Sequence, residues 1–163
     1  MDEVFRINEP DAELMATSRD EVLTNLHAHL PDARIEEVGS TAVEGVLGKG
    51  DLDFLVLVSE ADFGSAREIL DTLYPRNAEQ LSNDSYQGYL VPSSLDVAIQ
   101  LTIKGTQYDT FLSFLDLLRR DANLRDAYNT LKRTYDGKPM SEYRAAKSQF
   151  IEAALTASAQ NST

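Results

Sequence analysis

Three aspartates of this 163-residue chain lie in two short segments, and each segment leads into an apolar run. Asp51 and Asp53 stand two positions apart, and a strand places residues at that spacing on the same face. Carboxylates this close repel each other unless a cation lies between them. Mg²⁺ prefers hard oxygen ligands, usually one or two carboxylates together with substrate phosphates. Asp96, polar in a second apolar stretch, completes a cluster of three if the two strands are neighbours.

A glycine and a serine precede the acidic pair, and ten residues separate Ser40 from Asp51. Gly39 lets the backbone approach a ligand closely, and the Ser40 hydroxyl with nearby backbone N–H groups can hydrogen-bond phosphate oxygens. This set is typical of two-metal phosphoryl or nucleotidyl transfer. One metal binds the triphosphate, and the other lowers the pKa of an acceptor hydroxyl, with a carboxylate as ligand or base.

The predicted site therefore has metal ligands, catalytic carboxylates and phosphate ligands. The expected cofactors are Mg²⁺ or Mn²⁺ and a nucleoside triphosphate, with ATP as the default. The candidate metal ligands are Asp51, Asp53 and Asp96, of which Asp53 and Asp96 are also the candidate catalytic groups. The candidate phosphate ligands are Gly39, Ser40, Lys49, Lys132 and Lys147.

The three lysines each have a structural alternative. Lys49 precedes the acidic pair and can equally be a solvated loop residue. Lys132 and Lys147 each follow a tyrosine by four positions, which is one helical turn. Such pairs face a cleft or, more commonly, lie on the surface with the lysine stem covering apolar neighbours.

Hydrophobic periodicity predicts the elements that hold these residues. The 51–58 strand is apolar on both faces after Asp53, which is typical of a central strand. The order predicts an α+β (mixed α/β) fold, in which helices flank a central mixed sheet and the C-terminal part is helical. One domain is expected over 1–155, with a disordered tail at 156–163. Helices are expected over 11–30, 60–73, 107–120, 122–136 and 141–155, and strands over 34–38, 51–58, 79–82, 86–91 and 95–101.

Composition limits the classes of function. The net charge is −12, from 27 acidic and 15 basic residues, and so acidic a body disfavours a nucleic-acid partner. No cysteine is present, which excludes thiolate zinc sites. His27 and His29 point different ways on a helix, so they cannot chelate a metal together. No signal peptide or membrane span is evident, and the cytoplasm is the expected compartment. The sequence specifies neither the acceptor, a small molecule or a protein, nor the oligomeric state.

The pattern of a hydrophobic residue with Gly-Ser, then Asp-hydrophobic-Asp, then a later hydrophobic-Asp-hydrophobic resembles the nucleotidyltransferase superfamily. More narrowly, the run Ile35-Glu-Glu-Val-Gly-Ser-Thr-Ala-Val-Glu-Gly-Val-Leu-Gly-Lys49 is similar to the GrpB family. Three C-terminal segments agree with the helical part of that family. They are Phe114-Leu-Asp-Leu-Leu118, Tyr128-Asn-Thr-Leu-Lys132 and Tyr143-Arg-Ala-Ala-Lys-Ser-Gln-Phe-Ile151. The resemblance covers about residues 10–155 and implies the nucleotidyltransferase fold.

Four positions depart from the GrpB pattern. Glu44 stands where the family favours proline, and Gly50-Asp51 stands where it favours proline and an apolar residue. Asp96 stands near the position where histidine is common. The chain thus carries the fuller acidic triad of active nucleotidyltransferases.

The sequence favours an enzyme that transfers a nucleoside monophosphate from a triphosphate to a hydroxyl or amine. One alternative is a non-catalytic nucleotide-binding or regulatory module on the same fold, favoured by the small size. Another is a metal-dependent phosphohydrolase with an Asp-x-Asp nucleophile. Against it, Gly-Ser lies upstream and no threonine follows Asp53 at the usual interval.

Overall fold

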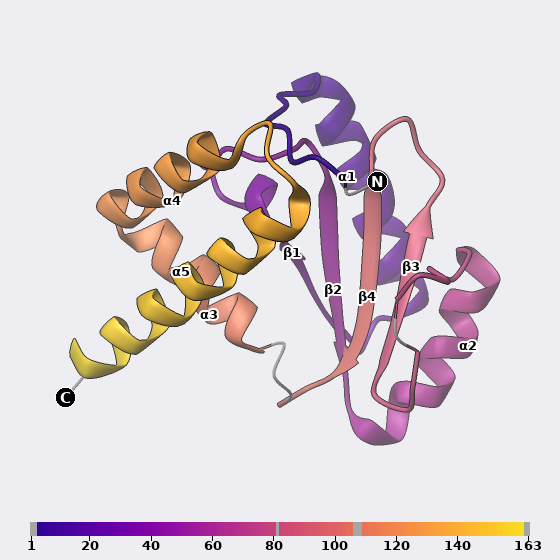
Figure 1. Ribbon diagram of the computed structural model, residues 1–163. Coiled ribbons are helices and arrows are strands. Elements are labelled where there is room, and N and C mark those ends of the chain that lie inside the picture. The colour runs from indigo at the N-terminus through magenta and orange to yellow at the C-terminus, as the bar shows by residue number, and fades with distance from the viewer. Residues whose placement is uncertain (1–2, 81, 106–108, 162–163) are drawn as a thin grey trace. The chain divides into compact units, whose positions relative to one another are not determined.

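The computed structural model describes residues 3–80, 82–105 and 109–161 (Figure 1). Contacts between residues divide the chain into two compact units. The sheet unit consists of Pro10–Gly39 and Asp51–Asp109, and the helical unit consists of Met1–Glu9, Ser40–Gly50 and Thr110–Thr163. The loop from Ser40 to Gly50 thus belongs to the helical unit although both of its chain neighbours belong to the sheet unit. The single domain predicted from the sequence stays a prediction.

A four-stranded mixed sheet forms the sheet unit, in the order β1-β2-β4-β3. The central strands β2 and β4 are parallel, and each edge strand is antiparallel to its neighbour. The central place predicted for the 51–58 strand is confirmed, because β2 lies between β1 and β4. The strands are β1 (Arg34–Val38), β2 (Leu52–Val58), β3 (Tyr86–Val91) and β4 (Val97–Ile103).

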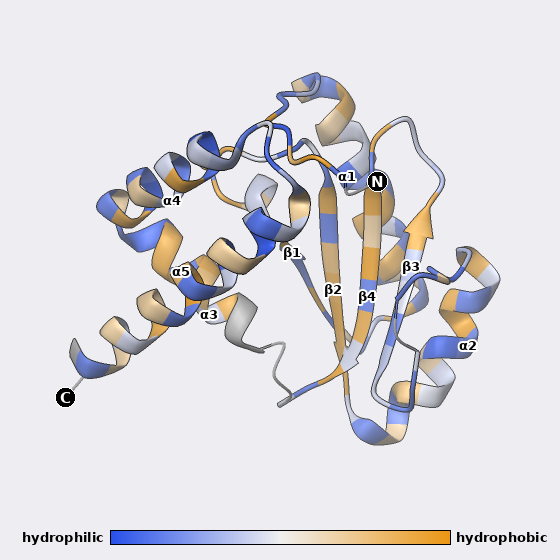
Figure 2. Cartoon of the chain, viewed as in Figure 1, coloured by the Kyte–Doolittle hydropathy of each residue, from blue (hydrophilic) through white to orange (hydrophobic). Residues whose placement is uncertain are grey.

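Two helices, α1 (Ala12–His29) and α2 (Phe63–Leu73), share one core with this sheet. Asp11 begins α1 by accepting a hydrogen bond from the backbone N–H of Leu14. A 3₁₀ turn over Glu60–Asp62 leads into α2. Apolar residues dominate β2 and β4 (Figure 2), which fits strands covered on both faces. The fully buried members of this core are Leu26, Leu52, Phe54, Val56, Leu70, Tyr89, Ile99 and Leu101.

Three helices make up most of the helical unit: α3 (Asp109–Arg120), α4 (Ala122–Tyr135) and α5 (Met140–Asn161). Asp121 caps α4 by accepting hydrogen bonds from the N–H groups of Asn123 and Leu124. The rings of Tyr128 and Phe150 stack 5.2 Å apart between their centroids, and Phe114 meets both edge-on. Aromatic packing therefore contributes to the core of the helical unit.

Several element bounds differ from those expected. Residues 79, 80 and 82 are not in a strand, and residue 81 lies outside the described residues. Instead, Arg76 forms an isolated bridge with Tyr89 of β3. The tail predicted to be disordered continues α5 as far as Asn161, and residues 162–163 lie outside the described residues. None of the described helices is long and apolar enough to cross a membrane.

Candidate functional site

Asp51 and Asp53 lie at the start of the central strand β2. Asp51 directly precedes the strand, and Asp53 is its second residue and is half-buried. The register places Asp53 between Val38 of β1 and Ala98 of β4. A rigid central strand therefore fixes the backbone of this pair, with neighbours on both sides.

Asp96 lies just before β4 rather than within it, which corrects the strand expected over 95–101. A turn at Ser93 and Ser94 delays the strand, and the Ser93 hydroxyl accepts a hydrogen bond from the Leu95 N–H at 3.2 Å. The Asp96 carbonyl accepts a hydrogen bond of 2.8 Å from the Leu52 N–H. Asp96 is therefore held beside the start of β2, at the same end of the parallel pair as Asp51, and its side chain is exposed.

Within the described residues, no group of three or more histidine, aspartate or glutamate side chains is arranged to hold a metal ion. Asp51, Asp53 and Asp96 are all described, so they do not form a ready-made three-carboxylate cluster. Mg²⁺ usually takes one or two protein carboxylates and completes its shell with phosphates and water. The Asp51–Asp53 pair fits that donor set, and the assignment of all three aspartates as metal ligands stays a prediction.

Gly39 directly follows β1 in a left-handed conformation, with φ of +82°. A Cβ atom at this position would lie 2.8 Å from Oδ2 of Asp53, closer than real Cβ contacts allow. The sequence predicts that Gly39 lets the backbone approach a ligand closely, and that stays a prediction. What the structure shows is a close approach of the Gly39 backbone to the carboxylate of Asp53.

Ser40 and Lys132 come together within the helical unit. The Lys132 ammonium donates a hydrogen bond to the Ser40 hydroxyl and lies 4.4 Å from the centre of the Tyr128 ring. Lys132 is 1% exposed, so it does not occupy the surface position that its spacing commonly indicates. Burial, with a smaller contribution from Tyr143, raises the pKa of the Tyr128 hydroxyl far above its ordinary value, and this ring stays neutral beside the ammonium.

The other two lysines are less enclosed. Lys147 is half-buried, and its Nζ lies 6.0 Å from the centre of the Tyr143 ring, at the limit of a cation–π contact. Lys49 is half-buried on the loop between Ser40 and Asp51. Their assignment to phosphate binding stays a prediction. The two histidines, His27 and His29, are exposed on α1.

Asn129 holds the backbone of the same loop and was missed by the sequence reasoning. Its side-chain carbonyl accepts a hydrogen bond of 2.8 Å from the Leu47 N–H, and its amide donates one of 2.7 Å to the Gly45 carbonyl. Asn129 is 7% exposed, so it acts as a buried substitute for a peptide group. It stands within the Tyr128–Lys132 segment that resembles the GrpB family, which was the available signal.

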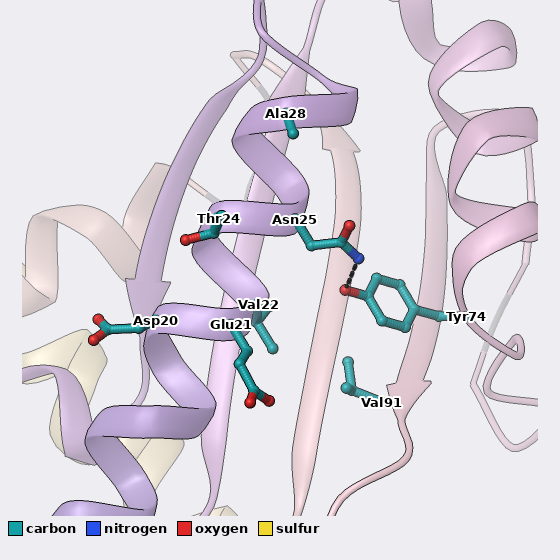
Figure 3. Close-up of a pocket in the computed structure, with 8 residues that line it drawn as sticks. All are labelled: Asp20, Glu21, Val22, Thr24, Asn25, Ala28, Tyr74 and Val91. Carbon is teal, nitrogen blue, oxygen red and sulfur yellow. Dashed lines mark hydrogen bonds between the residues drawn. The ribbon is translucent and has the colours of Figure 1, made fainter.

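A separate groove of about 640 Å³ lies between α1 and the edge of β3 (Figure 3). Asn25 donates a hydrogen bond of 2.7 Å to the Tyr74 hydroxyl across this groove. Asp20 and Glu21 supply its charged side chains, and Val22 and Val91 contribute apolar surface. The groove contains none of the residues predicted to act on a nucleotide.

Comparison with solved structures defines the fold class. The conserved protein GrpB from Enterococcus faecalis superposes with a TM-score of 0.68 at 18% identity, over 92% of this chain and 97% of that one. Cid1, described as an RNA terminal uridylyl transferase, superposes with a TM-score of 0.51 at 16% identity, over 77% of this chain. Only 40% of the Cid1 chain is covered. The chain therefore has a nucleotidyltransferase fold.

The family follows from the sequence comparisons. The GrpB protein family matches residues 6–157, and the chain belongs to that family. A UPF0157 protein of Vibrio cholerae is 36% identical over 78% of this chain and 69% of its own length. A UPF0157 protein of Deinococcus radiodurans is 26% identical over 93% of this chain and 81% of its own length. None of these names states a reaction.

Proposed function

We propose that this chain is a metal-dependent nucleotidyltransferase, which moves a nucleoside monophosphate from a triphosphate to an acceptor hydroxyl or amine. The supporting observation is the register of the two parallel central strands. It brings Asp51 and Asp53 to the same end of the sheet as Asp96. Carboxylates from neighbouring strands at one end of a sheet suit a hard cation and its phosphate ligands.

In this proposal Asp51 and Asp53 hold the metal, and Asp96 accepts the proton of the acceptor. The acceptor oxygen or nitrogen forms a bond to the α-phosphorus, and the bond from that phosphorus to pyrophosphate breaks. A bound metal would supply charge neutralisation for the phosphates. Gly39, Ser40 and Lys49 are the proposed phosphate contacts, with Lys147 as an additional cation. Lys132 is nearly fully buried against Ser40, so its main proposed role is to orient the Ser40 hydroxyl.

Calorimetric titration of the chain with Mg²⁺ and a non-hydrolysable ATP analogue tests the binding step. A structure of the Cid1 poly(U) polymerase is described as bound to MgATP, with a TM-score of 0.50 and 19% identity, which recommends this probe. Asp53→Asn keeps the side-chain shape and removes one charge, and we expect binding to weaken at least about tenfold. Asp84→Asn makes the same charge change at an exposed loop position and should leave binding unchanged. Absence of binding by the unaltered chain would overturn the nucleotide assignment.

A second candidate is a module that binds a nucleotide without catalysis. It is favoured by the exposed position of Asp96 before β4 and by the lack of a three-carboxylate metal group among the described residues. Release of pyrophosphate from ATP in the presence of Mg²⁺ separates the candidates, because only a transferase produces it. Release of inorganic phosphate instead would indicate a phosphohydrolase.

A further inference from the structure

Two arginines meet the glycine-containing loop in a pocket of about 350 Å³ within the helical unit. Arg119 lies in the last turn of α3, and Arg125 lies in the first turn of α4. The loop contributes Val43, Glu44 and Gly45. None of these residues belongs to the proposed nucleotide site.

The guanidinium of Arg125 is fixed by the end of α3. Its Nη1 donates hydrogen bonds of 2.6 Å to the Leu118 carbonyl and 3.0 Å to the Arg119 carbonyl. The Nε and Nη2 groups make no hydrogen bond with any described residue. Nε lies 4.0 Å from the point that a Cβ on Gly45 would occupy. Part of a rigid donor fork therefore faces the loop with hydrogen-bonding capacity left over.

Arg119 contributes a second charge that is only weakly engaged. Its Nη2 donates to the Ala42 carbonyl at 3.3 Å, which directs the side chain to the loop. Its Nη1 lies 3.7 Å from Oδ1 of Asp116, and both side chains are largely exposed. An exposed ion pair of this length contributes little, so the charge of Arg119 stays available to a ligand.

The loop adds backbone donors and one opposing charge. Gly45 has φ of +85°, which a glycine adopts without strain. The N–H groups of Glu44 and Gly45 donate to no described residue. The exposed carboxylate of Glu44 is within 4.0 Å of no basic group in the described part of the chain. Arg119 and Arg125 bring two positive charges to the pocket, opposed by Glu44 in its lining and by Asp116 beside Arg119, in a chain whose net charge is −12.

We propose that this pocket binds the phosphate group of a small phosphorylated molecule. A guanidinium fork matches the oxygens of a phosphate. The volume of about 350 Å³ suits a phosphate with a small organic part. The acidic body of the chain disfavours a long polyanion. The site goes beyond the proposed transferase, because it needs neither the metal nor the aspartates on the sheet.

Binding is tested by following the arginine Nε–H signals in ¹⁵N–¹H NMR spectra of the full chain, with EDTA present and no nucleotide. Inorganic phosphate, ribose 5-phosphate and a short single-stranded oligonucleotide are titrated separately. We expect the first two to shift the Arg125 Nε–H signal. Tighter binding of ribose 5-phosphate than of phosphate identifies a phosphorylated molecule as the source, and equal binding identifies free phosphate. Tighter binding of the oligonucleotide, or no shift with phosphate, would overturn the small-ligand proposal.

Three variants make the test specific. Arg119→Gln should weaken phosphate binding about tenfold, whereas Arg120→Gln removes the same charge from the next position of α3 and should change it less than about twofold. Glu44→Gln removes the opposing carboxylate and should tighten binding about two- to fivefold. Equal weakening by the two arginine variants would refute a specific site. The Asp53→Asn variant should keep full phosphate binding, so a failed transferase proposal and a failed phosphate site are distinguishable.

Discussion

Replacing Gly39 with alanine perturbs the point where the backbone of β1 meets the Asp53 carboxylate. The left-handed conformation of this residue costs an alanine about 1–2 kcal/mol. The new methyl group would lie 2.8 Å from Asp53 Oδ2, and the oxygen must retreat by a few tenths of an ångström. Because Oδ2 ends a side chain, this retreat costs little folding free energy. It moves a proposed metal ligand, however.

Gly105 offers a matched control, since its φ is +83° and an added Cβ there would meet nothing within 4 Å. Gly105→Ala therefore carries the backbone cost without the contact. We expect both variants to lower the free energy of unfolding by about 1–2 kcal/mol in urea titrations. Only Gly39→Ala should weaken Mg²⁺–ATP binding, by about tenfold or 1.4 kcal/mol, because only this variant displaces a proposed metal ligand.

A double-mutant cycle tests the contact without any ligand. In an Asp53→Ala background the added methyl group has no carboxylate to displace, so the cost of Gly39→Ala should fall. The coupling free energy should lie at the lower end of the range of about 0.5–3 kcal/mol seen for residues in contact. If the two changes add independently and Gly39→Ala binds Mg²⁺–ATP like the unaltered chain, the reasoning about this contact is wrong.

Three further expectations concern the scaffold. Leu52→Ala truncates a fully buried side chain and should cost about 2–5 kcal/mol in urea unfolding, whereas Asp53→Asn should leave stability equal or higher by relieving repulsion with the neighbouring carboxylate. Asn129→Ala removes both hydrogen bonds to the loop and should lower the free energy of unfolding by about 1–3 kcal/mol. A hydrogen bond from Arg76 holds the pKa of Asp71 below its ordinary value of 3.8. The stabilisation from this hydrogen bond is complete at pH values above the ordinary pKa of Asp71 and is lost as the pH falls through the lower pKa of Asp71 in the folded chain. The melting temperature of the Asp71→Asn variant should therefore depend less on pH below about 4 than that of the unaltered chain.

Most of the fold was predictable because its elements are locally encoded. Strand β1 begins and ends where periodicity predicts, and β2 begins one residue later than expected. The strand expected over 79–82 was wrong for residues 79, 80 and 82, because strand propensity there competes with a loop. The Asn77 N–H bonds to the Gly88 carbonyl, so the chain crosses the edge of β3 without continuing as a strand. Such tertiary competition is invisible in a single sequence.

The site was predictable in its residue types but not in its partners. The spacing of Asp51 and Asp53 needs only the geometry of a strand. The start of β4, by contrast, is set by its pairing with Leu52 and by the turn at Ser93, so Asp96 fell outside it. The burial of Lys132 depends on Ser40, which is 92 positions away. Long-range contacts of this kind decide which polar groups are enclosed, and no local pattern contains them.

The departures from the GrpB pattern fall where charge decides what each site can bind. Asp51 and Asp96 add carboxylates at one end of the parallel strand pair, where we propose that they favour a cation. Glu44 adds a carboxylate beside Arg119 and Arg125, where it opposes an anion. A proline at position 44 would remove this carboxylate and also the Glu44 N–H, which donates to no described residue and is one of the donors of the pocket. Glu44→Pro should therefore tighten phosphate binding less than Glu44→Gln does, whereas a pocket with no anion to bind would show no change with either variant.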